Sequence, residues 1–184
     1  ALVDLPADIR VYVLANEVQN YSSSDLLDRL LTDYIRTSDG SYKADIAAAL
    51  PMIPDKDLLA QIVAEYENSE TIKPQDLRAW YRGVLANDHG QQLAWDWIRN
   101  DWQWLEDTVG GDMEFPTFIT VTAGIFKTPQ RLAEFKEFFE PKINIPGLTR
   151  EIQMDTKVIE SRVALIENEK DAVNKAINLF VFNN

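Results

Sequence analysis

The segment SSSDLLDRLLTDYIR, residues 22–36, decides the fold class. Its apolar residues come in adjacent pairs that repeat every four positions, namely Leu26, Leu27, Leu30, Leu31, Tyr34 and Ile35. This spacing places all of them on one face of an α-helix, whose period is 3.6 residues. The preceding residues 22–25 offer hydroxyl and carboxylate oxygens to the free N–H groups of the first turn. The segment therefore predicts an amphipathic helix that must bury one face against a neighbour.

The same apolar stripe recurs outward from this segment, for example at residues 58–66 and 77–85. It predicts nine helices, at residues 6–18, 22–36, 40–51, 54–68, 74–86, 90–106, 114–126, 129–140 and 149–180. Four of them have a proline (Pro6, Pro54, Pro74 or Pro129) at or near the start, where a helix tolerates this residue because the first-turn N–H has no partner. The β-branched run 118–122 also fits a strand, but it would have no strand to pair with.

Alternate predicted helices begin near residues 6, 40, 74 and 114, about 34 to 40 residues apart, which is the period of helical-hairpin repeats. Short connections are typical of antiparallel helix neighbours. The sequence thus predicts an all-α fold, an α-α superhelix of antiparallel helical hairpins like the HEAT and armadillo solenoids. Because the chain holds no linker or low-complexity segment, we expect a single domain over residues 1–184.

Composition excludes several classes of function. Acidic residues outnumber basic residues 30 to 18, and a net charge of -12 disfavours nucleic acids and anionic membranes as partners. No stretch approaches the 18 apolar residues of a membrane span. Cysteine is absent, which removes disulfides, zinc–cysteine sites and cysteine nucleophiles, and favours a reducing compartment such as the cytoplasm.

Catalytic motifs are also missing. The chain has no H-E-x-x-H, no phosphate-binding glycine loop and no G-x-S-x-G element. Its single histidine, His89, excludes metal sites built on a pair of histidines, and lies in a polar turn, residues 87–90, that suits the capping of a helix better than catalysis. Paired carboxylates fall on the polar faces of the predicted helices, where solvation is the usual role. We therefore predict no catalytic residue and no metal ligand in this chain.

Four tryptophans lie within ten residues: Trp95, Trp97, Trp102 and Trp104. On one continuous helix, the first and third would share a face, and the second and fourth would share another. This arrangement predicts a helix packed on two sides, with stacking on a ligand as the alternative. Gly83 and Gly124 lie inside predicted helices, where they indicate close helix–helix approach, or else a hinge or ligand contact.

The residues around the tryptophans follow the pattern G-x-x-L-A-W-D-[FW]-[LIV]-R-x-[ND]-W, carried here by Gly90, Leu93, Ala94, Trp95, Asp96, Trp97, Arg99 and Trp102. This pattern resembles a signature in the C-terminal domain of the aminopeptidase N-type zinc aminopeptidases, a gluzincin family with bacterial members. Further elements resemble the family in order, at residues 8–10, 43–50, 72–76 and 126–139. Residues 161–165, SRVAL, depart from the A-N-I-x-W common in the family.

The resemblance implies a role for the chain. The family's members are metalloprotease hydrolases that remove N-terminal residues from peptides, and their zinc-binding H-E-x-x-H precedes the region matched here. The chain would then be an excised C-terminal domain, with no catalytic or zinc-binding residue of its own. It would cap the parent's catalytic domain and wall the chamber that receives the peptide. The signature residues would be mainly structural, with His89 as a candidate for the chamber wall.

Two other functions fit parts of the sequence. A free-standing α-solenoid adaptor explains the helices, the charge and the lack of catalytic motifs, but not the ordered match to the family. A small enzyme that uses a carboxylate pair would need a buried acid with a raised pKa. The reading frame upstream of Ala1 distinguishes the capping domain from the adaptor, because only a peptidase parent encodes H-E-x-x-H there.

Overall fold

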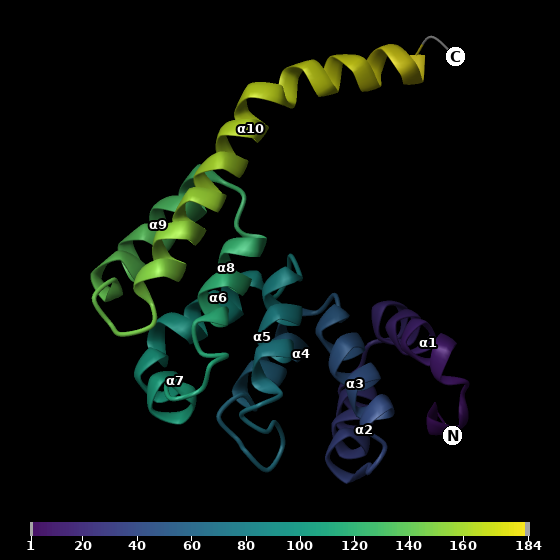
Figure 1. Ribbon diagram of the computed structural model, residues 1–184. Coiled ribbons are helices and arrows are strands. Elements are labelled where there is room, and N and C mark those ends of the chain that lie inside the picture. The colour runs from purple at the N-terminus through teal and green to yellow at the C-terminus, as the bar shows by residue number, and fades with distance from the viewer. Residues whose placement is uncertain (1, 183–184) are drawn as a thin grey trace. The chain divides into compact units, whose positions relative to one another are not determined.

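The computed structural model describes residues 2–182, and within that range it contains ten α-helices, three 3-10 helices and no strand (Figure 1). The elements are η1 (Leu2–Asp4), α1 (Ala7–Asn20), α2 (Ser24–Arg36), α3 (Gly40–Ala49), η2 (Leu50–Met52), α4 (Lys56–Ala64), α5 (Leu77–Ala86), α6 (Gln91–Asn100), α7 (Trp102–Val109), α8 (Thr117–Ile125), α9 (Pro129–Phe139), η3 (Glu140–Lys142) and α10 (Thr149–Phe182). The all-α prediction is confirmed.

The chain divides into two compact units, Ala1–Phe115 and Pro116–Asn184; the single domain expected from the sequence stays a prediction. In the first unit, α1 packs on α3, α3 packs on α2 and α5, and α4 and α5 pack on α6. Helices that are near neighbours in sequence therefore share one core. Its largest fully buried side chains include Leu14, Leu27, Leu30, Tyr34, Ile46, Tyr66, Trp80, Tyr81 and Trp95.

The second unit is built on α10, which packs along α8 and α9. The buried side chains between these helices include Phe118, Ile119, Phe135, Phe139, Ile152 and Ile159. Arg162 of α10 donates from Nη1 to the carbonyl oxygens of Ala123 and Phe126, at 2.6 Å each. These carbonyls lie at the end of α8 and have no partner within that helix, so Arg162 serves as its C-terminal cap.

Side-chain caps fix where several helices begin. The Ser23 hydroxyl accepts from the backbone N–H of Leu26, and the Thr128 hydroxyl accepts from that of Arg131. The first of these caps lies within residues 22–25, which the sequence offers for this role. Asp39 and Asp55 play the same role for α3 and α4, each accepting two backbone N–H groups of the first turn.

The predicted helix over residues 90–106 is wrong, because the chain breaks at Asp101 into α6 and α7. Asp101 has φ -111° and ψ 22°, outside the helical region. Trp95 and Trp102 consequently lie on different helices instead of sharing one face. The break lets the Trp102 ring pack against Phe115, with ring centroids 5.1 Å apart. Burial of this ring pair stabilises the arrangement in which the helix is broken.

Two open alternatives are also decided by the structure. The β-branched run 118–122 lies in α8, so the strand alternative is wrong. A Cβ atom on Gly83 would lie 2.7 Å from the Pro51 ring, which confirms the close approach predicted there. At Gly124 the same prediction is wrong, because nothing lies within 4 Å of the position that a Cβ atom would take.

Candidate functional site

Helix α6 carries most of the signature residues and places three of them, Ala94, Trp95 and Trp97, in the core of the first unit. Ala94 and Trp95 are fully buried, and Leu93 is half-buried. The guanidinium of Arg99 lies 5.0 Å from the centre of the Trp95 ring and also pairs with the carboxylate of Asp96. The Arg99 side chain therefore covers one side of the Trp95 ring while it holds the Asp96 carboxylate.

Trp97 stands at the centre of an aromatic cluster. Its ring centroid lies 4.9 Å from that of Tyr66, 5.9 Å from that of Tyr81 and 6.3 Å from that of Trp104. Its indole Nε1 donates to a carboxylate oxygen of Glu67 at 3.2 Å. Only 6% of Trp97 is exposed, so this ring packs in the core, whereas Trp104 is half-buried.

The turn before α6 positions His89 at the surface. Asn87 donates from its side-chain amide to the carbonyl oxygens of Pro51 and Ile53, at 2.8 and 2.9 Å, and its Oδ1 accepts from the backbone N–H of His89. Gly90 follows, where a Cβ atom would lie 2.8 Å from the Val84 carbonyl oxygen. The turn is thus held in place while the His89 side chain stays exposed.

His89 lines a surface hollow of about 480 Å³, the His89 pocket. The other lining residues are Gln19, Pro51, Met52, Pro54, Gly83, Ala86, Asn87 and Asp88. Gly83 and Ala86 also line a larger hollow of about 630 Å³ between α3 and α5, the α3–α5 groove. The two hollows therefore adjoin at Gly83 and Ala86 on α5.

The α3–α5 groove combines a floor of small side chains with polar groups. The small residues are Gly40, Ala44, Ala47, Ala48, Ala79, Gly83 and Ala86. The remaining lining residues are Tyr34, Lys43, Gln75, Asp76 and Arg82. Small side chains leave room for an extended peptide to approach closely, and the polar groups can hydrogen-bond to its main chain. The groove can therefore hold a peptide without a catalytic group.

Tyr34 links three helices beneath this groove. Its hydroxyl donates to an Asp76 carboxylate oxygen at 3.1 Å and accepts from Trp80 Nε1 at 3.2 Å. The Lys43 ammonium lies 4.6 Å from the centre of the Tyr34 ring. Burial raises the pKa of Tyr34 to about 12, and the charge of Asp76 acts in the same direction. The hydroxyl consequently stays protonated at neutral pH and keeps both hydrogen bonds.

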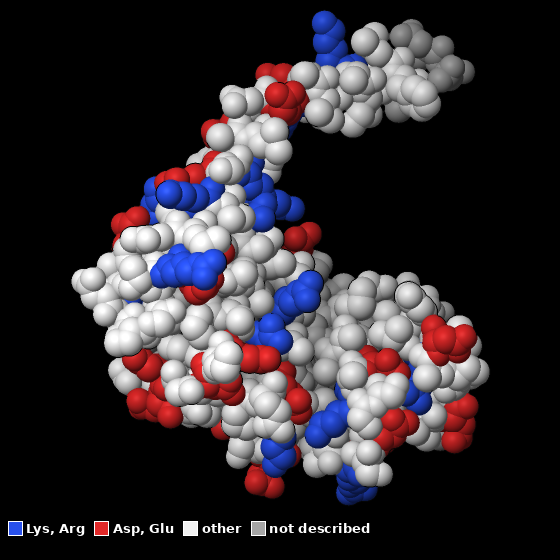
Figure 2. All heavy atoms as spheres, viewed as in Figure 1, with Lys and Arg blue, Asp and Glu red and all other residues white. Residues whose placement is uncertain are grey.

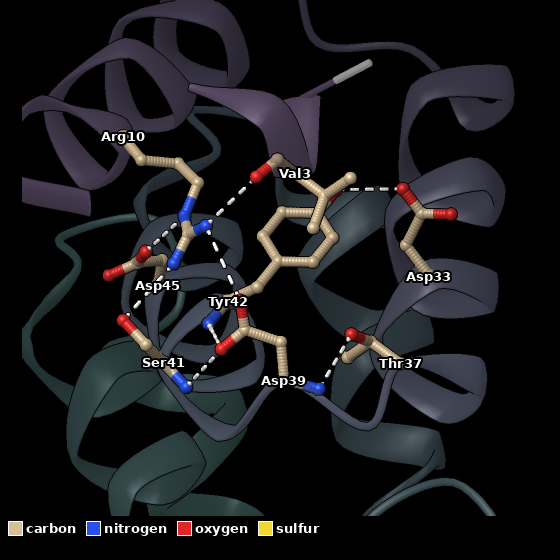
Figure 3. A network of polar contacts seen from close by, with 8 residues as sticks. All are labelled: Val3, Arg10, Asp33, Thr37, Asp39, Ser41, Tyr42 and Asp45. Atoms are coloured by element: carbon tan, nitrogen blue, oxygen red, sulfur yellow. Dashed lines mark hydrogen bonds and ion pairs between the residues drawn. The ribbon is translucent and has the colours of Figure 1, made fainter. Parts of the chain in front are cut away.

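Arg10 fixes α3, which forms one wall of the groove, to the N-terminal elements (Figure 3). Only 3% of Arg10 is exposed to solvent. It donates to Asp45 Oδ2 at 2.6 Å, to the Ser41 hydroxyl at 3.1 Å and to the Val3 carbonyl oxygen at 3.2 Å. A buried arginine with this many partners is a positioning element.

Zinc does not fit the residues that the structure describes. Residues 2–182 contain no group of three or more His, Asp or Glu side chains arranged to hold a metal ion. His89 and the nearby Asp88 are exposed and have no third His, Asp or Glu beside them in the same pocket.

Among the helices of residues 2–182, none combines the length and apolar content that a membrane span requires.

The sequence pattern pointed to His89 but missed the larger groove beside it. The signal was present in the small residues of α3 and α5, which recur at three- and four-residue intervals at 44, 47 and 48 and at 79, 83 and 86. Such spacing places small side chains along one helix face. The polar residues of the groove come from three helices, so no single segment could identify them together.

Comparison with known proteins agrees with this architecture. Residues 2–161 match the family described as ERAP1-like C-terminal domain. The chain is 62% identical over 173 residues to aminopeptidase N of Lactobacillus helveticus, covering 94% of this chain and 20% of that protein. It is 54% identical over 176 residues to aminopeptidase N of Lactobacillus delbrueckii subsp. lactis, covering 96% of this chain and 21% of the relative.

A more distant relative is glutamyl aminopeptidase of Bos taurus, 24% identical over 173 residues, with 93% of this chain and 18% of the relative covered. The chain spans about a fifth of the length of these curated relatives. The family match extends over most of the chain and includes the signature helix α6. The chain belongs to the family of ERAP1-like C-terminal domains.

Proposed function

We propose that this chain is the C-terminal capping domain of a zinc-dependent aminopeptidase that removes N-terminal residues from peptides. The observation that carries the proposal is the 62% identity to a bacterial aminopeptidase N over 94% of this chain. The parent's catalytic domain holds the zinc and performs hydrolysis. This chain covers that domain through an intramolecular interface and contributes no reacting group.

The helical hairpins form part of an α-α superhelix, and their small-residue depression faces the peptide. The α3–α5 groove and the His89 pocket together give an elongated surface along α5. Main-chain contacts with such a surface accept many peptide sequences, as a general aminopeptidase requires. The lack of cysteine supports a cytoplasmic location, and the net charge of -12 on this chain disfavours contacts of this domain with nucleic acids or anionic membranes.

The first experiment compares this 184-residue chain with the product of the complete reading frame. Both are incubated with aminoacyl-p-nitroanilides, and bound zinc is measured after dialysis. We expect turnover and stoichiometric zinc only in the longer protein. Zinc-dependent turnover by this chain alone would refute the proposal. An upstream frame without H-E-x-x-H would favour the adaptor alternative.

A second experiment tests the groove in the longer protein. Ala48 is exposed on α3 and lines the groove, so Ala48→Trp fills it without entering the core. We expect the KM for peptides of eight or more residues to rise several-fold, while kcat/KM for aminoacyl-p-nitroanilides stays unchanged. The matched control is Ala64→Trp, at an exposed position on α4 outside both hollows. An equal KM for long peptides in the two variants would show that the groove does not bind the peptide.

A further inference from the structure

The second unit carries an apolar stripe on α10 that continues beyond its own core. Isoleucine, valine or phenylalanine recurs every seven residues along this helix, at Ile152, Ile159, Ile166, Val173 and Phe180. Ile152 and Ile159 are 1% and 0% exposed, because α8 and α9 cover this face of α10. A seven-residue repeat keeps nearly the same helix face, so the later positions continue the face that is buried earlier.

Beyond Val163 the stripe continues on an exposed part of the helix. Every residue from 164 to 180 is exposed, including Ile166 at 39%, Val173 at 51% and Ile177 at 53%. These residues span about 25 Å of helix, at 1.5 Å per residue. Figure 1 shows this half of α10 extending past α8 and α9, and Figure 2 shows uncharged surface along it between small groups of charged residues. Apolar area of this extent is typical of an interaction surface.

We infer that residues 164–180 of α10 dock on an apolar helical face of the parent aminopeptidase's preceding region, as an extension of the α8–α10 contact. This inference rests on the proposed function. It commits to the parent because about four-fifths of the length of the curated relatives lies outside this chain. The continuous seven-residue repeat indicates a helix as the partner, since α8 already occupies the same stripe in that manner.

Charge and length argue against a second copy of this chain or a membrane as the partner of the stripe. Two copies of this chain would each bring a net charge of -12, and the exposed stripe covers fewer than the three to four heptads of a stable coiled coil. Residues 164–180 hold three acidic and two basic side chains, so they lack the basic face of a membrane-binding helix. Glu169 lies within the apolar arc, and a partner face with a basic side chain opposite it would complement its charge.

The absence of cysteine allows a direct test by thiol protection. Val173→Cys places a thiol on the stripe, and the control Asn178→Cys places one about 140° around the helix, on the polar face. Each variant is prepared in this chain and in the longer protein, and its rate of reaction with a thiol reagent is compared with that of the unsubstituted background. We expect the thiol at 173 to react about tenfold more slowly in the longer protein, and the thiol at 178 to change less than twofold.

Peptidase turnover is measured in the same preparations. Equal thiol reactivity at 173 in this chain and in an active longer protein would overturn the inference and leave the proposed function standing. Absence of zinc and turnover in the longer protein would refute the proposed function and, with it, this inference. Concentration-dependent dimerisation of this chain that Val173→Glu abolishes would assign the stripe to a second copy and overturn the inference.

Discussion

Gly83 of α5 and Pro51 of η2 lie so close that a Cβ atom on the glycine would stand 2.7 Å from both Cβ and Cγ of the proline ring. The proline is fully part of the core and its ring cannot swing aside as a long side chain would. This contact joins α5 to the turn that follows α3. It also sets the floor where the α3–α5 groove meets the His89 pocket.

Substituting Gly83 by alanine should therefore destabilise the protein. Over-packing of this kind costs about 1–3 kcal/mol, which exceeds the gain of up to about 1 kcal/mol from the better helix propensity of alanine. Urea unfolding gives the change in the free energy of unfolding. The control is Gly124→Ala in α8, where nothing lies within 4 Å and a small stabilisation is expected. A more stable Gly83→Ala variant would contradict the close contact.

Trp95→Ala should cost about 3–5 kcal/mol, because it leaves a large cavity at a fully buried position. A loss of this size is a large part of the 5–15 kcal/mol by which a domain is stable. Trp104→Ala, at a half-buried ring, serves as the control and should cost less. The free energy of unfolding in urea distinguishes them. A midpoint that barely moves for Trp95→Ala would revive the ligand-stacking interpretation.

Tyr34→Phe should destabilise the protein by about 1–3 kcal/mol at pH 7, because the buried indole N–H of Trp80 loses its acceptor. The size of this loss should depend on pH. Burial raises the pKa of Tyr34 to about 12, so the unfolded chain releases this proton first, near pH 10. The contribution is complete below pH 10 and falls as the pH rises through about 12.

The measurement is urea unfolding of the native sequence and the Tyr34→Phe variant at pH 7, 10 and 11. The difference in unfolding free energy between them should shrink at the higher values. Burial also raises the pKa of Tyr66, and that residue affects both proteins equally. The control Tyr12→Phe alters a side chain that is 73% exposed and should change nothing. A difference independent of pH would contradict the argument.

Arg162→Met should destabilise the second unit by about 2–3 kcal/mol, since charged hydrogen bonds to two carbonyl oxygens at the end of α8 are lost. Lys157→Met, at an exposed position on the same helix, is the control and should change stability by less than about 0.5 kcal/mol. Hydrogen exchange at the last turn of α8 should accelerate in the arginine variant alone. Equal protection in both variants would show that the cap contributes nothing.

Much of this fold could be predicted because apolar stripes and caps are local signals. The helix over residues 22–36 is observed as α2 with its serine cap at Ser23, and the helix over residues 129–140 is observed as α9, which begins at Pro129 as expected. Asp101 carries no such signal, since residues on both sides favour a helix and neither proline nor glycine interrupts them. Trp102, the first residue after the break, packs against Phe115, a contact that the apolar pattern of residues 90–106 does not contain.

The departure from the family pattern at residues 161–165 has a structural role that sequence comparison could not suggest. Within SRVAL, Arg162 caps α8 across 36 to 39 residues of sequence. Likewise, the packing of α2, α3 and α5 brings together the polar residues that line one groove. They are Tyr34, Lys43, Asp76 and Arg82. A cap or groove whose residues come from several helices can be identified only once the packing of these helices is known.

The buried half of α10 also determines how much backbone entropy is lost when its exposed half binds a partner. An isolated helix of 17 residues is marginal in water, because forming its first turn fixes several residues for a single hydrogen bond. In this protein that nucleus already exists, since residues 149–163 are held against α8 and α9. Residues 164–180 continue an established helix and present their apolar side chains in a fixed register. Association through this segment therefore incurs little loss of backbone entropy, and its affinity can come almost entirely from the apolar surface that it buries.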